Sequence, residues 1–276
     1  MRTVTSISEI FKNQVFNTSS KPLQVEADDF NTYICKHTKE HKANLLFNEY
    51  LAAKFLQAWR IVIPEMVFIH VKEEHVTHEI LSGWIQYANF EKTCIGFEYL
   101  NHAIHLSEID YGLKNNKTAK QNLINKEDLL RIILFDIWLS NEDRNHNNYN
   151  LLLNPEDAGY RIIPIDHEYI FNSNSPERGI YPINEDDSLA TTSLFKALFP
   201  KQNKNKIVKL ANQIIDEFNK HVVNCLNTTD TIFQEIPEDW NVDKSLKKEK
   251  LEHIFSEEWY KQTIKSFNAF VHRNLK

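Results

Sequence analysis

The sequence predicts an α+β protein of two parts, a small sheet-rich part at residues 1–100 and a larger, mostly helical part at 101–276. Short segments in which apolar and polar residues alternate, the period of a strand, lie before residue 101. Apolar residues at three- and four-residue spacing, the period of a helix, dominate the chain from Phe195 onward. A chain of 276 residues can form one large domain or two lobes that share an interface.

The first part is predicted to be a small sheet with one helix. Residues 31–37 (NTYICKH) alternate with the period of a strand, and residues 43–59 carry apolar side chains at helical spacing. Branched and aromatic residues predict a strand at 64–72, and a further strand is expected to end near Tyr99.

The second part begins with a helix too apolar to lie on a surface. Residues 126–139 form this helix, and we expect the side chain of Asn125 to cap its N-terminus. Residues 151–153 and 160–166 then predict a β-hairpin, with Gly159 at a position of positive φ in its turn.

Composition excludes several classes of function. The five glycines form neither GxxxxGK[ST] nor GxGxxG, so a glycine-rich phosphate loop is excluded. The net charge of −6 and the pI near 6.1 argue against direct nucleic-acid binding. The three cysteines are distant from one another and odd in number, which is typical of free thiols in a reducing compartment. We see neither a signal peptide nor a membrane-spanning segment, and expect a cytoplasmic protein that does not bind membranes.

A polar run at residues 140–150 (SNEDRNHNNYN) separates the apolar helix from the hairpin. Because the two ends of a hairpin meet, Asp166 must return close to Asn148 and Asn150, and Asp143 would face the same site. Oxygen atoms from Asp and Asn suit Mg²⁺ that is shared with substrate phosphates. A second Asp can orient a hydroxyl group and accept its proton, so the arrangement predicts phosphoryl transfer.

The segments FDIWLSNEDRNHNNYNLLL and IDHEYIF resemble the catalytic loop and the metal-binding Asp of the HipA-like kinases. The resemblance extends from about Asn17 to Phe171 and implies a protein-kinase-like bilobal fold. It also implies an ATP- and Mg²⁺-dependent serine/threonine protein kinase in a toxin–antitoxin setting. Asp143 would be the catalytic residue, and Asn148 and Asp166 would hold the metal.

The resemblance also assigns nucleotide-binding residues in the first part of the chain. Lys36 stands where these kinases keep the lysine that contacts ATP phosphates, and Glu49 stands where a helix glutamate pairs with that lysine. The backbone from Glu98 to Leu100 is expected to bind adenine.

The phosphate loop around FNTSSKPL contains no glycine, unlike that of the family. Backbone amides and hydroxyl groups of Thr18, Ser19 and Ser20 are expected to serve in its place. Glu168 replaces the glycine of the family's IDHG pattern.

The catalytic loop departs from the family's pattern at two further places. Asn145 stands where the family has His, with His146 one position later. Asn150 immediately precedes the three leucines, so either Asn148 or Asn150 can be the metal ligand. Arg144 can brace the loop by binding a carboxylate or can bind phosphate, and the bidentate geometry of its guanidinium favours the brace.

Two other functions fit the same residues. A small-molecule or lipid kinase would use the same site on a hydroxyl acceptor that is not a protein. A catalytically inactive pseudokinase that acts as a binding module would explain the absent glycines, Asn145 and Glu168. A regulatory or antitoxin partner is also expected from the resemblance.

Overall fold

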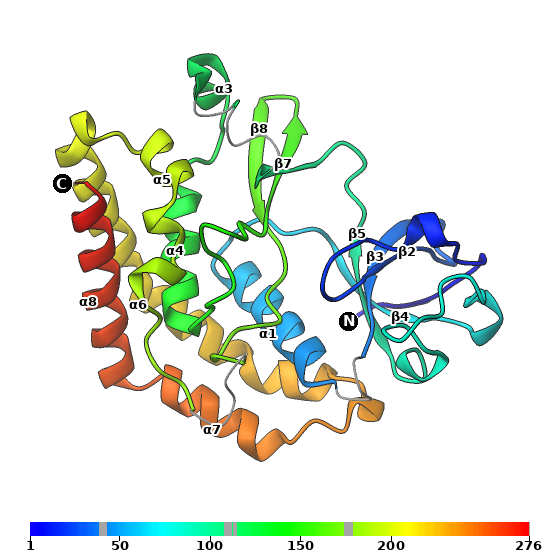
Figure 1. Cartoon of the computed structure of the whole chain (residues 1–276). Helices are drawn as coiled ribbons and strands as arrows, with labels where there is room; N and C mark the ends of the chain where they lie inside the picture. Colours follow the sequence, from blue (N-terminus) through cyan, green and yellow to red (C-terminus); the bar gives the residue numbers. More distant parts are fainter. Residues whose placement is uncertain (39–42, 108–111, 113–114, 174–178, 276) are drawn as a thin grey trace. The chain divides into compact units, whose positions relative to one another are not determined.

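The computed structural model describes residues 1–276 except 39–42, 108–111, 113–114, 174–178 and 276 (Figure 1). The chain divides into two compact units, which are described separately below. The first unit comprises residues 1–54, 64–101 and 230–243, and the second comprises residues 55–63, 102–229 and 244–276. Among the described helices, none is long and apolar enough to cross a membrane.

The sheet of the first unit contains five strands, which are β1 (Thr3–Thr5), β2 (Leu23–Glu26), β3 (Thr32–Lys36), β4 (Met66–His70) and β5 (Cys94–Glu98). Their order in the sheet is β1-β4-β5-β3-β2. Strands β1 and β4 are parallel, and the other neighbours are antiparallel. The strands predicted at residues 31–37 and 64–72 and near Tyr99 are therefore confirmed as β3, β4 and β5.

The centre of the sheet has no room for a side chain at Gly96 in β5. A Cβ atom at this position would lie 2.2 Å from the side chain of Ile69 on the neighbouring strand. Gly96 is paired with Cys35 on one side and Val67 on the other, so it lies between two strands that are both fully buried there. Glycine permits this close packing of side chains over β5.

Helix α1 (Asn44–Ala58) confirms the helix predicted at residues 43–59. Within the first unit it packs on the sheet through Tyr50, whose ring centroid lies 5.4 Å from that of Phe68 in β4. Residues 230–243 join the same unit, where Trp240 Nε1 donates a hydrogen bond of 2.7 Å to the carbonyl oxygen of Thr93. Segments far apart in sequence thus share one core.

Glu235 connects this late segment to α1 by polar bonds. Its Oε2 accepts a hydrogen bond of 2.5 Å from the Tyr50 hydroxyl and lies 2.8 Å from Lys54 Nζ. Partial burial raises the pKa of Glu235, but the bonds from Lys54 and Tyr50 outweigh burial and lower its pKa to about 2.

We expect Glu235→Gln to remove a pH-dependent part of the stability. Because the folded-state pKa is below the unfolded value, the charged group contributes fully above about pH 5 and loses its contribution as pH falls toward 2. Denaturant unfolding at pH 7 should show a loss of about 1–2 kcal/mol, a figure reduced for solvent screening. At pH 2.5 the difference between the variant and the wild type should fall to about a quarter of its value at pH 7. An equal difference at both pH values would contradict the assignment.

The second unit contains a three-stranded sheet and most of the helices. The strands are β6 (Ile104–His105), β7 (Leu151–Glu156) and β8 (Gly159–Pro164) in the order β6-β7-β8. The helices are α3 (Lys117–Gln121), α4 (Asp128–Leu139), α5 (Ser193–Leu198), α6 (Lys204–Glu235), α7 (Lys244–Ile254) and α8 (Glu257–Asn274). Of these, α6 ends inside the first unit.

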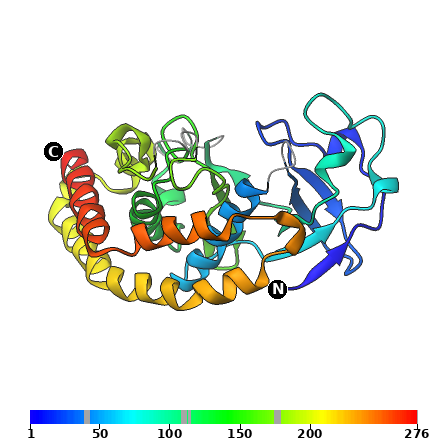
Figure 2. The same cartoon turned by 90° about the horizontal axis from the view of Figure 1, so that it is seen from below.

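Helix α4 is the buried centre of the second unit, as its apolar sequence predicts, since nearly every residue from Leu129 to Leu139 is buried. Trp138 of α4 donates a 2.9 Å hydrogen bond to the carbonyl oxygen of Ile254, and its own carbonyl accepts one of 2.8 Å from Trp259. Helices α6 and α8 lie side by side (Figure 2), joined by rings of Phe218 and Tyr260 that stack at 4.9 Å.

The predicted capping role of Asn125 is wrong. Its side chain instead bonds to Ile162 of β8, accepting from the backbone N–H at 2.9 Å and donating to the carbonyl oxygen at 3.0 Å. Buried backbone groups without a partner cost about 1–3 kcal/mol each, and the Asn125 amide satisfies the N–H and the carbonyl group of Ile162. Nδ2 of Asn125 also donates a 3.0 Å hydrogen bond to Oδ2 of Asp128, the first residue of α4, so Asn125 joins the start of α4 to the hairpin that precedes Asp166.

The hairpin and the positive φ of Gly159 are confirmed, but the predicted turn at residues 154–159 is too long, because β7 and β8 extend through Glu156 and from Gly159. Glu156 pairs with Gly159 across a two-residue connection, and Gly159 has φ +140°. A Cβ atom at Gly159 would lie 2.2 Å from the carbonyl oxygen of Asn122, which also accepts a 2.8 Å hydrogen bond from the Tyr160 amide. The glycine is required both by the backbone conformation and by this contact.

Candidate active site

The loop that carries Asp143 begins where α4 ends. Ser140 adopts a left-handed conformation with φ 49°, which stops the helix. The Asn141 side chain then accepts a 3.3 Å hydrogen bond from the backbone N–H of Asp143. Asn141 is fully buried, so the loop leaves the core at a fixed point.

Two asparagine amides hold the carboxylate of Asp143. Asn148 Nδ2 and Asn150 Nδ2 each donate a hydrogen bond of 2.9 Å to Oδ2 of Asp143. The structure thus brings both candidate metal ligands to the predicted catalytic residue. Because the two amides bind the same oxygen atom, these contacts alone do not distinguish between them.

Asn145, at the position where the family has histidine, makes hydrogen bonds within the loop. Its side chain donates a 3.0 Å hydrogen bond to the carbonyl oxygen of Glu142 and accepts one of 2.9 Å from the backbone N–H of Asn147. Its backbone exchanges hydrogen bonds with that of Asn148 in both directions. Asn145 closes the loop from within, whereas His146 is exposed.

The hairpin brings Asp166 close to Asn150, which binds Asp143. Because Leu151 pairs with Pro164, the next residues outward are Asn150 and Ile165, and the Ile165 amide donates a 3.0 Å hydrogen bond to the Asn150 carbonyl oxygen. Both Asn150 (φ 45°) and Asp166 (φ 59°) have left-handed backbone. Such residues are uncommon outside glycine and cluster at functional sites.

The environment of Asp143 raises the pKa of its carboxyl group. Burial is the largest cause, and the negative charge of Asp166 is the second. Hydrogen bonds from Asn150 and Asn148 and the charge of Arg144 oppose this rise. A carboxylate with a raised pKa is a stronger base than an ordinary aspartate, which suits proton transfer from a hydroxyl group.

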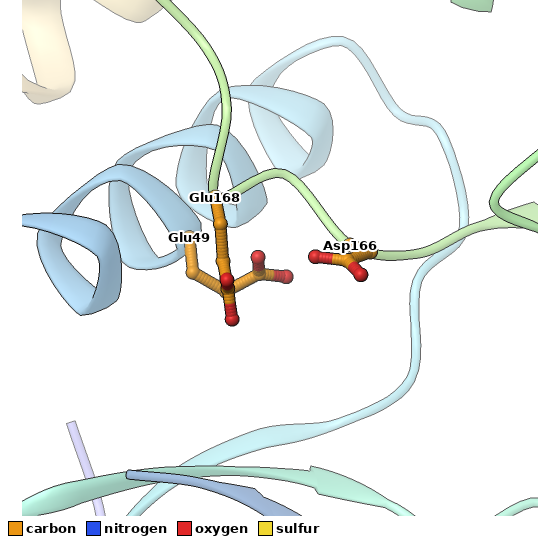
Figure 3. Close-up of side chains that lie close together, drawn as sticks. All are labelled: Glu49, Asp166 and Glu168. Carbon is orange, nitrogen blue, oxygen red and sulfur yellow. The ribbon is translucent and has the colours of Figure 1, made fainter. Parts of the chain in front are cut away.

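A second carboxylate lies beside Asp166. Figure 3 shows Asp166 and Glu168 on the segment that follows β8, and their carboxylate oxygen atoms lie within 4.8 Å of each other. Glu168 is buried and Asp166 is partly buried. Oxygen donors of this kind fit a hard cation such as Mg²⁺. From the sequence, Glu168 was identified only as a departure from the family's pattern. Its position two residues after Asp166, a predicted metal ligand, was the signal that it is part of the candidate site.

In the first unit, Lys36 and Glu49 form a buried ion pair. Lys36 is the last residue of β3 and Glu49 lies on α1, where Figure 3 draws it. Lys36 Nζ lies 3.0 Å from Glu49 Oε2, with side-chain exposures of 8% and 2%. The structure therefore contains the pair that the sequence predicts.

The predicted phosphate loop is a bend before β2. The Thr18 amide donates to the carbonyl oxygen of Phe16 and is not available to a ligand, contrary to the expectation for Thr18. The amides of Ser19 and Ser20 have no acceptor among the residues that the structure describes. Lys21, with φ 46°, turns the chain toward β2 without a glycine.

The segment proposed for adenine follows the end of β5. The amide of Glu98 donates a 2.8 Å hydrogen bond to the carbonyl oxygen of Glu65, so it is already used in the sheet. Leu100 is half-buried, and its amide has no acceptor within the described part of the chain. Of the Glu98 and Leu100 amides, that of Leu100 is therefore the one able to donate a hydrogen bond to adenine.

Asp136 is a buried residue of the site that the sequence did not identify. It lies within α4, is 2% exposed, and its Oδ1 lies 2.5 Å from Arg144 Nη1. The signal was a single acid in the apolar run RIILFDIWL, because a buried charge requires a partner. The brace predicted for Arg144 is confirmed by this contact.

The fold and this constellation together define a kinase-like phosphotransferase class. The first unit has a sheet and a buried lysine–glutamate pair. In the mainly helical second unit, the loop after α4 carries Asp143, and Asp166 follows the hairpin. The family model for HipA-like kinases matches residues 7–270, and the chain belongs to this family.

The fold resembles that of a known kinase. The crystal structure of the Helicobacter pylori proinflammatory kinase CtkA matches with a TM-score of 0.51 and 14% sequence identity, covering 99% of this chain and 100% of that chain. At this identity the match shows a shared fold. A search of curated proteins found no match.

Proposed function

We propose that the protein is an ATP- and Mg²⁺-dependent phosphotransferase that transfers the γ-phosphoryl group of ATP to a hydroxyl acceptor. The observation that supports this best is the carboxylate of Asp143, which is held by two amides and has a raised pKa close to the charge of Asp166. A positioned base beside a second carboxylate is what phosphoryl transfer requires of a protein.

In the proposed reaction, the acceptor oxygen forms a bond to the γ-phosphorus as the bond to the bridging oxygen of ADP breaks. The hydroxyl proton passes to Asp143, and ADP leaves. The amides of Asn148 and Asn150 keep the carboxylate in one orientation. Positioning of this kind accounts for most of the catalysis expected in phosphoryl transfer.

The metal would be held by Asp166 together with Asn148 or Asn150. Glu168, beside Asp166, adds a further oxygen donor. When bound, Mg²⁺ neutralises the negative charge of the phosphates. The all-oxygen character of these side chains supports Mg²⁺ in preference to a transition metal.

The nucleotide phosphates would be bound by the first unit. Lys36, fixed by Glu49, is proposed to neutralise the α- and β-phosphates, and the amides of Ser19 and Ser20 to donate to them. The adenine base would meet the backbone between Glu98 and Leu100.

Membership of the HipA-like kinase family supports a serine or threonine side chain of a protein as the acceptor. It also supports control by a regulatory or antitoxin partner in the cytoplasm. A small-molecule or lipid acceptor would use the same Asp143, and a screen of protein-free acceptors separates these proposals.

The first test is the thermal stability of the wild type and of Asp166→Ala with ATP and Mg²⁺, separately and together. Ligand at about 100 times its Kd adds roughly 2.7 kcal/mol to the native state, which corresponds to a rise of roughly 5–10 °C. We expect this rise in the wild type only with both ligands, and its loss in Asp166→Ala.

Asp166→Asn is the matched control for backbone strain. Asparagine tolerates the left-handed conformation at residue 166 better than alanine, yet it carries no charge for the metal. Both variants should lose the response to ATP with Mg²⁺ whatever their own midpoints are. No response in the wild type, or an unchanged response in both variants, would refute the metal–nucleotide site.

A catalytically inactive binding module is the second candidate. The phosphate loop without glycine favours it, because, of the three amides expected to bind phosphate, that of Thr18 is already bonded and those of Ser19 and Ser20 lack an acceptor among the described residues. Binding of ATP without hydrolysis or transfer to any acceptor would support this module over the enzyme.

A further inference from the structure

Arg144 holds both neighbours of Asp166 with one nitrogen atom. Its Nη2 donates a hydrogen bond of 2.6 Å to the carbonyl oxygen of Ile165 and one of 2.9 Å to Nε2 of His167. Arg144 also directly follows Asp143 in the chain. One fully buried guanidinium therefore joins the backbone of the proposed base to the residues on either side of the proposed metal ligand.

The other donors of Arg144 fix the guanidinium to the core. Nη1 donates to Oδ1 of Asp136 at 2.5 Å, and Nε lies 3.4 Å from the carbonyl oxygen of Asn150. Asp136 in turn accepts a 2.9 Å hydrogen bond from Asn141 Nδ2. Burial raises the pKa of Asp136 and the charge of Arg144 opposes that rise, as expected for a buried ion pair.

The contact with Arg144 determines the form of His167. A guanidinium only donates hydrogen bonds, so Nε2 of His167 must be the acceptor in this contact and carries no proton in it. His167 is 2% exposed, and its ring lies edge-on to Phe135 at a centroid distance of 6.3 Å. Nε2 is therefore unavailable to a metal ion or to a proton from the substrate.

We infer that His167 is a positioning residue and that Asp136, Arg144 and His167 form a chain that sets the placement of Asp166 relative to Asp143. This inference rests on the proposed function. Asp136 anchors the chain in α4, Arg144 spans the loop and the hairpin, and His167 holds the residue after Asp166. The left-handed backbone of Asp166 is kept by its two neighbours.

Neither a lysine nor an apolar side chain can reproduce these contacts. Four N–H groups of Arg144 point in different directions in one plane, whereas a lysine donates from a single atom. Glutamine at residue 167 still offers a side-chain oxygen to Arg144, but leucine offers no acceptor. These differences allow positioning to be separated from packing.

The form of the His167 ring can be measured without any catalytic assay. Two-bond ¹⁵N–¹H correlation spectra distinguish the two neutral forms and the charged ring, and the His167→Gln spectrum identifies the signal. We expect Nε2 to carry no proton. A proton on Nε2 would overturn the inference.

The kinetic test compares His167→Leu, His167→Gln and Arg144→Lys in Mg²⁺-dependent ATP hydrolysis, with water as the acceptor. Displacement of a reacting group by about 1 Å lowers rates by about 100-fold. We expect kcat to fall roughly 10- to 100-fold in His167→Leu and Arg144→Lys, with KM for ATP changed less than about 3-fold. His167→Gln should keep kcat within about 3-fold of the wild type.

Phe218→Leu is the control for stability alone, because Phe218 is fully buried in the same unit and stacks on Tyr260. It should lower the thermal midpoint and leave kcat unchanged. The inference is overturned if His167→Leu keeps the wild-type kcat or if His167→Gln loses as much activity as His167→Leu. A wild type that neither binds nor hydrolyses ATP refutes the proposed function and the inference with it, whereas a proton on Nε2 of His167 in an active wild type refutes the inference alone.

Discussion

Asp143→Asn is expected to lower phosphoryl transfer by about 10²- to 10⁴-fold, the usual contribution of a positioned base. Asparagine has the shape of aspartate but cannot accept the hydroxyl proton. Its oxygen can still receive the amides of Asn148 and Asn150, so the loop should keep its structure. Because burial already disfavours the charged form of Asp143, the thermal midpoint should be unchanged or higher.

Labelled ATP, with a panel of protein and small-molecule acceptors, measures this effect. Asp157→Asn is a matched control, since Asp157 is exposed in the turn of the same hairpin. It should retain full activity. Asp143→Asn should also keep the stabilisation by ATP and Mg²⁺. Transfer at the wild-type rate in Asp143→Asn would remove Asp143 from the mechanism.

Lys36→Met is expected to produce the largest loss of stability. It leaves the carboxylate of Glu49, which is only 2% exposed, without the ammonium group 3.0 Å away. Breaking a buried pair in this way costs roughly 3–5 kcal/mol, which is a large share of the stability of an ordinary domain. Denaturant unfolding monitored by tryptophan fluorescence would measure it.

The double variant Lys36→Met/Glu49→Met separates stability from function. The double variant leaves no buried carboxylate of Glu49 without its ammonium partner, so much of the lost stability should return. Neither Lys36→Met nor the double variant should be stabilised by ATP with Mg²⁺, because both lack the Lys36 ammonium group that is proposed to bind the phosphates. If the double variant regains stability and also binds ATP as the wild type does, Lys36 and Glu49 form a structural pair with no role in nucleotide binding.

Much of the site could be predicted from the sequence because its geometry is local. A buried helix, a polar loop and a hairpin follow one another, and antiparallel pairing alone returns Asp166 to Asn150. The turn at Gly159 fixes the register of that pairing. Lys36 and Glu49 were assigned by the resemblance to the HipA-like kinases, which places them on a strand and on the helix that follows it.

The remaining features depend on contacts that are distant in sequence or that cross an irregular loop. Asn125 has the residue type and the position expected of a helix cap, but its side chain binds Ile162, a strand residue 37 positions later. Arg144, the partner of Asp136, is only eight residues away, but it lies in a loop whose path no periodicity reveals. Local patterns describe which element a residue belongs to, whereas these side chains are placed by the packing of one element on another.

The choice between Asn148 and Asn150 shows the same limit at close range. Sequence spacing favoured Asn148 by one rule and Asn150 by another, and both side chains bind Oδ2 of Asp143. Asn150 differs in that its backbone also belongs to the end of the hairpin, through the bond from Ile165. A loop with two equivalent amides can be described only once its fold is known.

The bend that carries Ser19 and Ser20 has a thermodynamic consequence. Glycine has more conformations to lose than any other residue, so a glycine-rich loop becomes ordered around phosphate at a large entropic penalty. In this chain the turn is made by Lys21, and the imidazole of His37 lies 3.2 Å from the Lys21 carbonyl oxygen. Such a bend loses less conformational entropy than a glycine-rich loop when it becomes ordered around a ligand. Its side chains, however, keep the backbone farther from the phosphates than glycine would.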